Sequence, residues 1–488
     1  MALQYPFLTR LDGTSPFFLP SAAAALVLLL WLLKRVLYPT YDPREPPALR
    51  PKIPFVGHVY SIVREGGPYF ERLKSARMPI CTVPVLGGKL YVINSPTLIS
   101  AAVSCPSMSF DPFILVFARN VQAVSKEDMQ RLKDPEYMHT AKKPFHPSMS
   151  GEPLREVIGA ALGKIAGELD GLGYGGEVCE VPDIGNWLKN LISQAVMAAL
   201  YGDKNPMTLE RLDDGDMQGA DSASREFDKK TTVLMLGLAP SLLAPKAVAA
   251  RNRIQAALHD YYLARHDEGP DVSALVKERA AIKREMGART IDLASSEMDI
   301  PWVTLINTVP ALIWVFVHVF SQRDYAERAQ QEAFETTSLR ADSATIDVDQ
   351  LTKKPFISAC VQEALRLYDK FCGYRHIVED TVLRDADGRE YLLKKGSTAQ
   401  WPHGVPHLDE SIWGLDAGVF NPDRFIDTPP EEEKRRRGAL MPFGGGCHGA
   451  SGETDCRICR GASSLGTRKC TESEVQAKTW LGEYAVEV

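Results

Sequence analysis

Residues 355–368, PFISACVQEALRLY, limit the possible folds of this chain more than any other segment. Apolar side chains recur there at three- and four-residue spacing, which predicts a helix with one apolar face made of Ile357, Cys360, Val361, Ala364, Leu365 and Tyr368. Glu363 and Arg366 are three residues apart, so they lie one turn apart on the flank of that helix. Among apolar neighbours a carboxylate and a guanidinium are tolerated only when they pair. The alternative is an ordinary surface ion pair, which contributes little stability.

Two short motifs follow this helix in a fixed order. Residues 420–425 read FNPDRF, and residues 442–446 read PFGGG. The succession of Glu-x-x-Arg, F-x-P-x-R-F and P-F-G-G-G resembles the cytochrome P450 family of haem-thiolate enzymes. In that family the Glu and Arg of the helix bind the Arg of the second motif and brace the loop that carries the haem-ligating cysteine. The resemblance implies this bracing role for Glu363, Arg366 and Arg424.

The resemblance covers roughly residues 17–446 and implies a mainly α fold with a small β region. It also implies haem b (iron protoporphyrin IX) as cofactor, bound by a catalytic domain at residues 55–446. Arg375 matches the position where relatives place a cation near a haem propionate, a natural pairing for guanidinium; the alternative is a surface salt bridge. Phe443 and Gly446 belong to the haem-binding loop by the same resemblance.

The N-terminal residues 1–38 are predicted to be a membrane anchor. Residues 17–33 carry no charge, and Lys34 and Arg35 follow at once, which favours a single-pass span with the following domain on the cytoplasmic side. A cleaved signal peptide and a buried core helix are the alternatives. Residues 39–54 contain six prolines and are predicted to form a stiff hinge. The resemblance implies the endoplasmic reticulum membrane.

Composition excludes some classes of protein. Among the 488 residues, nine cysteines, an odd number without a compact framework, argue against a disulfide scaffold and suit a reducing compartment. The net charge of −6 gives no reason to expect a nucleic-acid partner. The charged segment 267–298 is interpreted as a solvated helical connector.

Local patterns predict several further elements. Apolar runs on both sides of residues 86–88, Leu-Gly-Gly, predict a β-hairpin. Residues 96–200 are mainly helical in pattern, with breaks at prolines. The aromatic residues Phe110, Phe113 and Phe117 either line a substrate pocket or belong to the core.

Residues 300–322 form a second charge-free stretch. By length it could span a membrane, but Asn307, Thr308, Pro310 and His318 are awkward against lipid, which favours a long helix through the centre of the domain, bent at Pro310. Relatives usually carry an acid followed by threonine in this helix; here the acid is missing. The Asn-Thr-x-Pro run resembles the branch that contains the oxysterol 7α-hydroxylases and prostacyclin synthase. Asn307 and Thr308 are therefore the candidate distal-pocket residues; the alternative is that they only satisfy the kink at Pro310.

The resemblance breaks near residue 447. The family loop places its cysteine ligand seven residues after the phenylalanine, and seven after Phe443 stands Ala450, which cannot bind iron. The remaining residues, 447–488, form an atypical polar tail. Three interpretations stay open: a frame or splice error in the underlying gene, a rebuilt loop in which Cys447 ligates haem iron, and a catalytically dead, haemless protein. A zinc site formed by Cys447, His448 and the later cysteines fits no common structural spacing.

The function implied by the resemblance is a haem-thiolate monooxygenase acting on a lipophilic small molecule, such as a sterol-like, fatty or secondary metabolite. Electrons from NADPH would reach it through NADPH–cytochrome P450 reductase. The missing acid favours, as an alternative, an isomerase or dehydratase that needs no reductase, because an amide cannot shuttle a proton as a carboxylate does. The third hypothesis is a haemless membrane-bound binding protein.

Overall fold

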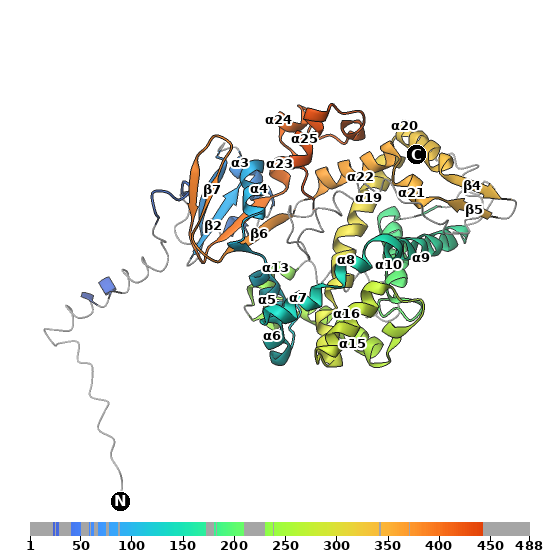
Figure 1. Ribbon diagram of the computed structural model, residues 1–488, viewed down its shortest axis with the longest axis horizontal. Coiled ribbons are helices and arrows are strands. Elements are labelled where there is room, and N and C mark those ends of the chain that lie inside the picture. The colour runs from blue at the N-terminus through green and yellow to red at the C-terminus, as the bar shows by residue number, and fades with distance from the viewer. Residues whose placement is uncertain are drawn as a thin grey trace, which may run out of the picture.

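The computed structural model describes residues 23–24, 26–28, 41–49, 58, 60–62, 67–74, 78–85, 88–171, 180–181, 183–208, 230–237, 239–340, 343–369 and 371–442. Within these residues the chain is mainly helical with a small β region at one side, as expected from the sequence (Figure 1). Phe443, Gly446, Cys447 and Ala450 lie outside the described residues, and so does nearly all of the predicted membrane anchor.

The β region is a mixed sheet with the strand order β1-β2-β9-β6-β3. Its strands are β1 (Ile80–Val85), β2 (Gly88–Ile93), β3 (Met108–Ser109), β6 (Cys372–Ile377) and β9 (Thr398–Pro402). The predicted hairpin is confirmed, because β1 and β2 pair antiparallel from Ile80–Ile93 to Val85–Gly88. The parallel pairing of β2 with β9 joins the first hundred residues to the last hundred described ones. Two separate hairpins are formed by β4 (Thr337–Arg340) with β5 (Ser343–Ile346) and by β7 (Thr381–Arg384) with β8 (Glu390–Leu393).

The helical part begins with short helices and continues with longer ones. The first group is α3 (Gly67–Lys74), α4 (Pro96–Val103), α5 (Asp111–Asn120), α6 (Lys126–Leu132), α7 (Pro135–Lys142), α8 (Phe145–Ser148), α9 (Gly151–Asp170) and α10 (Ile184–Tyr201). The second group is α13 (Thr231–Leu236), α14 (Pro240–Leu243), α15 (Pro245–Leu263), η1 (His266–Glu268), α16 (Ala274–Glu285), α17 (Thr290–Ser296) and α18 (Asp299–Val303). The third is η2 (Thr304–Thr308), α19 (Val309–Phe320), α20 (Arg323–Glu335), α21 (Val348–Leu351), α22 (Pro355–Tyr368), α23 (Gly404–His407), α24 (Glu410–Trp413), η3 (Pro422–Phe425) and α25 (Pro430–Ala439). Prolines at the starts of α4, α5 and α7 explain the predicted breaks, because proline is tolerated in the first turn of a helix.

A continuous rod of α18, η2 and α19 runs through the middle of the helical part (Figure 1). Among the described residues, the run Thr290–Phe320 is the one helix long and apolar enough to cross a membrane. Its side chains instead pack inside the domain: Val309 packs with Ile192 of α10, and Val319 packs with Phe356 of α22. Pro310 has no N–H to donate, and the turn before it widens into the π-helical segment η2, so the disturbance takes the form of a π-bulge.

The helix predicted at residues 355–368 is confirmed as α22, with the bounds expected. Its buried face differs from the predicted one. Phe356, Cys360, Glu363 and Leu367 are buried, whereas Ile357, Val361 and Leu365 are only half-buried. The ion pair therefore lies on the covered face, because residues 403–424 fold over that side of the helix.

The proline-rich hinge is attached to the sheet over its described part. Ala48 forms a parallel bridge with Thr82, and the amide of Leu49 donates to the Thr82 carbonyl. The buried carboxylate of Glu45 accepts hydrogen bonds from Lys89 Nζ at 2.7 Å and from the Tyr91 hydroxyl at 2.7 Å. The segment at residues 41–49 is thus held at a set angle to β1 and β2.

The interpretation of residues 267–298 as a solvated connector is wrong for the inner face of α16. Arg279 and Lys283 are buried there, and Glu297 is fully buried. Arg279 Nε pairs with Glu297 Oε2 at 2.8 Å, and Lys283 Nζ pairs with the other oxygen of the same carboxylate. The two cations and the carboxylate satisfy one another, so a segment that is charged in sequence lies partly in the core.

Candidate functional site

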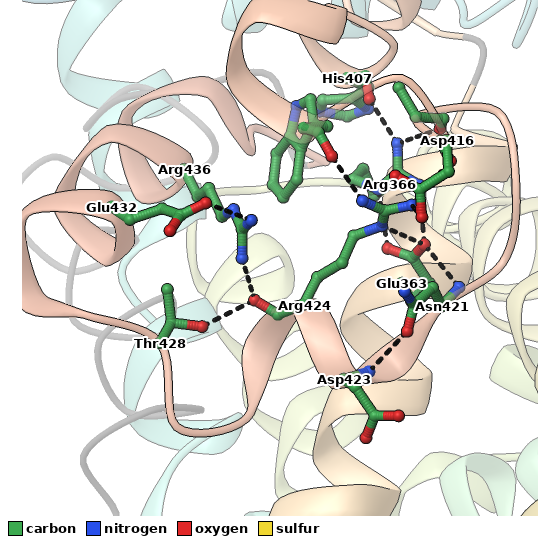
Figure 2. Close-up of polar contacts among 12 residues, drawn as sticks. Glu363, Arg366, His407, Asp416, Asn421, Asp423, Arg424, Thr428, Glu432 and Arg436 are labelled. Carbon is green, nitrogen blue, oxygen red and sulfur yellow. Dashed lines mark hydrogen bonds and ion pairs between the residues drawn. The ribbon is translucent and has the colours of Figure 1, made fainter.

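A buried ion-pair cluster connects α22 with η3 (Figure 2). Glu363 and Arg366 are both 0% exposed and form two parallel hydrogen bonds of 2.7 Å, from Arg366 Nε and Nη2 to the two carboxylate oxygens. Arg424 adds a third partner, with its Nε 3.4 Å from Glu363 Oε1. The same Glu363 oxygen accepts the backbone amide of Asn421 at 2.9 Å. We call Glu363, Arg366 and Arg424 the brace.

The guanidinium groups of the brace also bind the backbone of the segment that covers them (Figure 2). Arg366 Nη1 donates to the carbonyl oxygens of His407 and Ala417 at 2.6 and 2.7 Å. Arg424 donates to the carbonyls of Trp413 and Asp416. One buried pair therefore determines the path of residues 407–424, because each buried carbonyl needs a donor.

His407 connects this segment to the start of the glycine-rich loop. Its ring is 0% exposed, and its Nε2 accepts the backbone amide of Met441 at 3.0 Å. Met441 and Pro442 are the last described residues, so this bond holds the chain directly before Phe443. Sequence reasoning placed His407 in the family pattern but gave it no role, because a hydrogen bond between residues 34 positions apart leaves no local signal.

His407 should make the folded state acid-sensitive. Burial lowers its pKa from the ordinary 6.5 to about 3. The unfolded chain then binds a proton that the folded chain refuses, so this contribution to stability is lost as pH falls from about 6.5 toward 3. At pH 5 the loss is about 2 kcal/mol. Urea unfolding at pH 7 and pH 5 should show it, and His407→Gln, which keeps an acceptor for Met441, should reduce it; the half-buried His259→Gln should not. An equal pH difference in all three proteins would contradict this role.

Arg375 of β6 is a buried cation with an incomplete set of partners. It is 5% exposed, its Nη1 donates to the Tyr374 carbonyl, and its Nε has no hydrogen-bond partner among the described residues. Burial lowers the pKa of this guanidinium. The rings of Phe110 and Trp401 lie 5.6 and 5.5 Å from its central carbon. No carboxylate in the described part of the chain forms an ion pair with it, so the surface salt bridge considered as an alternative is absent there.

The central rod presents an exposed stripe. Only 12% of its most apolar window is buried, although the rod passes through the middle of the domain. The exposed side chains recur at helical spacing along one face, namely Val303, Asn307, Pro310, Trp314 and Val317. Thr308 and Leu312 are exposed beside this stripe. No item of hydrogen bonding inside the described chain satisfies the side chains of Asn307 or Thr308, so both remain available to a bound molecule.

The three aromatic residues singled out on α5 are half-buried and form two groups. Phe110 and Phe113 pack together, and Phe113 contacts Tyr374. Phe117 stacks on Trp302 of the rod at 5.0 Å and packs against the helical core. The first group lies beside Arg375, and Phe117 lies beside the start of the rod.

The described residues fit an iron protoporphyrin. The group is a flat apolar ring with two carboxylates at its edge, and it would need an apolar face and a cation. The rod supplies the apolar face, and Arg375 supplies a buried guanidinium whose Nε lacks a partner. Charge-assisted bonds from guanidinium to carboxylate are among the stronger hydrogen bonds of proteins. Within the described residues no cluster of three metal-binding side chains occurs, and the cysteines considered for zinc lie outside them.

Comparisons with known proteins agree on one family. The model of the family described as Cytochrome P450 matches residues 297–453. A cytochrome P450 monooxygenase of Gibberella zeae is 32% identical over 440 residues, covering 89% of this chain and 82% of that protein. The 7-alpha-hydroxycholest-4-en-3-one 12-alpha-hydroxylase of Oryctolagus cuniculus is 23% identical, covering 83% of this chain and 80% of that protein. The cholesterol 7-alpha-monooxygenase of Cricetulus griseus is 27% identical over 46% of each chain.

The solved structures support the same fold. A cyanobacterial cytochrome P450 with bound retinoic acid superposes with a TM-score of 0.62 at 19% identity, covering 87% of this chain and 91% of that chain. At this identity the likeness shows the fold alone. Taken with the identity to the Gibberella zeae protein over most of both chains, it establishes that this chain belongs to the cytochrome P450 family.

Proposed function

We propose that this protein is a haem-thiolate monooxygenase that oxidises a lipophilic small molecule with O2 and electrons from NADPH. The observation that carries the proposal is Arg375, a buried guanidinium that lacks a carboxylate partner among the described residues. An unpaired buried charge is costly, so its retention calls for an anionic ligand. A haem propionate supplies that charge next to the apolar stripe of the rod.

Haem would be held by Arg375 at its edge and by the loop of Phe443, Gly446 and Cys447 beneath. When bound, it supplies the chemistry of oxygen activation, which a thiolate ligand favours. The brace of Glu363, Arg366 and Arg424 fixes residues 407–424, and His407 fixes the entry to the loop. We assign the iron ligand to Cys447, since position 450, where the family carries its cysteine, is alanine.

Asn307 and Thr308 are the proposed distal residues. The amide donates a hydrogen bond to oxygen or to a polar group of the substrate, and the hydroxyl can donate or accept. Neither group carries an ionisable proton, so protons must arrive from water or from a more distant acid. The exposed apolar residues Val303 and Leu312 beside them would exclude water and hold an apolar substrate.

The substrate class follows from this surface and from the relatives. Two of the similar proteins are named for reactions on sterols, a 12-alpha-hydroxylase and a cholesterol 7-alpha-monooxygenase. We propose a sterol-like, fatty or secondary metabolite of similar apolar character.

Membrane attachment completes the proposal. Residues 1–38 would anchor the protein in the endoplasmic reticulum membrane, with residues 55–446 in the cytoplasm and NADPH–cytochrome P450 reductase as electron donor. The hinge, residues 39–54, would hold the domain at a set angle, since its residues 41–49 are bound to the sheet through Glu45 and Thr82. Of the predicted anchor, residues 23–24 and 26–28 are described; they are helical and exposed, as a segment meant for lipid would be outside it.

Haem content and the carbon monoxide spectrum test the proposal directly. The full chain, purified with detergent, should contain stoichiometric haem and show the Soret band of a thiolate ligand when reduced and bound to carbon monoxide. Cys447→Ser should remove that band, and Cys105→Ser, a half-buried cysteine near β7, should not. Arg375→Gln should weaken haem binding roughly tenfold or more, because it removes a charged hydrogen bond worth about 1.5–3 kcal/mol.

Two outcomes would overturn parts of the proposal. A full chain without haem would reject the monooxygenase and leave the haemless binding protein. Haem without the thiolate band, recovered in Ala450→Cys, would reject Cys447 as the ligand and keep the pocket.

The missing distal acid favours one second candidate, an isomerase or dehydratase that needs no reductase. Turnover of a hydroperoxide substrate, without turnover in the presence of NADPH and reductase, would establish it.

A further inference from the structure

A second group of reactive side chains lies where the central rod crosses the end of α22. The indole of Trp314 stacks on the ring of Tyr368, with centroids 3.9 Å apart and planes at 2°. The Tyr368 hydroxyl lies 2.7 Å from His318 Nε2. The His318 ring in turn stacks on Phe420, the first residue of the FNPDRF motif, at 4.0 Å and 4°. These contacts lock all three side chains into one geometry.

The hydrogen bond has a defined direction at neutral pH. Burial raises the pKa of Tyr368, so the phenol keeps its proton. Burial lowers the pKa of His318, against a smaller opposing effect of the Glu363 carboxylate, so the imidazole is neutral. The phenol O–H therefore donates, and the lone pair of His318 Nε2 accepts. The result is a phenol bound to a base that is ready to take its proton.

Trp314 connects this pair to the proposed distal face. It lies seven residues after Asn307 and four after Pro310, so the three share one face of the rod. Seven residues correspond to about 10 Å along a helix axis. The indole is 39% exposed, which leaves one side open while the other is covered by Tyr368. Trp314 is thus the oxidisable side chain of the stripe and stands between Asn307 and Tyr368.

We propose that Trp314, Tyr368 and His318 form a redox relay that accepts one oxidising equivalent from oxygen chemistry at the central rod. A strong one-electron oxidant takes an electron from Trp314, and Tyr368 returns one to the indole. As it loses the electron, Tyr368 transfers its phenol proton to His318 Nε2, giving a neutral tyrosyl radical and an imidazolium. A low-molecular-weight thiolate then supplies one electron, becoming a thiyl radical, and His318 returns the proton. The site would divert oxidising equivalents away from Asn307, Thr308 and the loop when substrate is not attacked.

The source of the oxidant rests on the proposed function, but the relay itself does not require it. A photo-excited ruthenium polypyridyl complex with a sacrificial quencher supplies a one-electron oxidant in solution, whether or not the chain holds haem. The full chain is irradiated with a nitroso spin trap, and peptide mass spectrometry quantifies the adduct at each tyrosine. Tyr41, which is 41% exposed and has no histidine contact among the described residues, serves as the internal reference.

The wild-type chain should carry an adduct at Tyr368 at least as abundant as at Tyr41, although Tyr368 is only half-buried. His318→Gln keeps a hydrogen-bond acceptor but no base, and should lower the Tyr368 adduct about tenfold at unchanged Tyr41 adduct. Trp314→Phe keeps an aromatic ring and should lower it several-fold. Tyr325→Phe, in the same core cluster, is the matched control and should change nothing.

The relay would be overturned if the wild-type chain carried no adduct at Tyr368, or if the yield there stayed within twofold in both His318→Gln and Trp314→Phe. Circular dichroism establishes that each variant is folded. Haem content is measured separately on the same preparations, so a haemless chain with an active relay rejects the proposed monooxygenase alone.

Discussion

Replacing Glu363 with alanine should leave little or no folded protein. Arg366 would then be a fully buried guanidinium without a counter-charge, and the Asn421 amide and Arg424 would lose the same acceptor. Breaking one side of a buried ion pair costs about 3–5 kcal/mol. A typical domain is stable by only about 5–15 kcal/mol, so this loss removes a large fraction of the total. The measurement is soluble yield together with the urea midpoint of unfolding.

The matched control for this prediction is Glu327→Ala. Glu327 pairs with Arg323 on α20 at 2.7 Å, but both side chains are exposed. Such a pair is worth about 0.3–0.5 kcal/mol, so this variant should unfold close to the parent. If Glu363→Ala and Glu327→Ala shifted the midpoint equally, the brace would be no more than a surface contact.

The second large effect is expected at Glu297. Burial alone would raise the pKa of this carboxyl, but Arg279 and Lys283 outweigh burial and hold the pKa below its ordinary value. Glu297→Gln would leave two buried cations without their shared counter-charge, at a cost of about 3–5 kcal/mol. Because Glu297 precedes the central rod by one residue, the start of the rod should loosen first. Urea unfolding and hydrogen exchange of residues 290–303 measure both effects.

Asp299→Asn provides the comparison for Glu297. Asp299 also pairs with Arg279, at 3.2 Å, but its side chain is 38% exposed and water can replace the lost charge. Its substitution should cost clearly less than that of Glu297. A reversed order would mean that the network is organised around Asp299, in contradiction to the burial seen here.

Several elements could be predicted from the sequence because their signals are local. The three- and four-residue spacing of apolar side chains defined α22, and a Gly-Gly pair between apolar runs defined the β1–β2 hairpin. The charge-free run at residues 300–322 defined the rod. The order of three motifs indicated the family, because short motifs are informative when their succession is fixed.

Long-range packing decided what each face of these elements does. The buried side of α22 includes Glu363 and Arg366 although the apolar pattern pointed to a neighbouring face, because residues 403–424 cover it. Likewise, α16 looks like a surface helix in sequence, yet it holds Arg279 and Lys283 in the core, where Glu297 from the next helix pairs with them.

The functional contacts depend even more on the fold. His318 and Tyr368 are 50 residues apart, and His407 and Met441 are 34 apart, so no window of the sequence contains either pair. The sequence alone determined the helices, the hairpin and the family, because periodicity and turn chemistry act over a few residues. Only the tertiary structure decided which charges are buried, that Arg375 lacks a partner, and that Trp314 lies on Tyr368, because burial and pairing depend on neighbours brought together from distant segments.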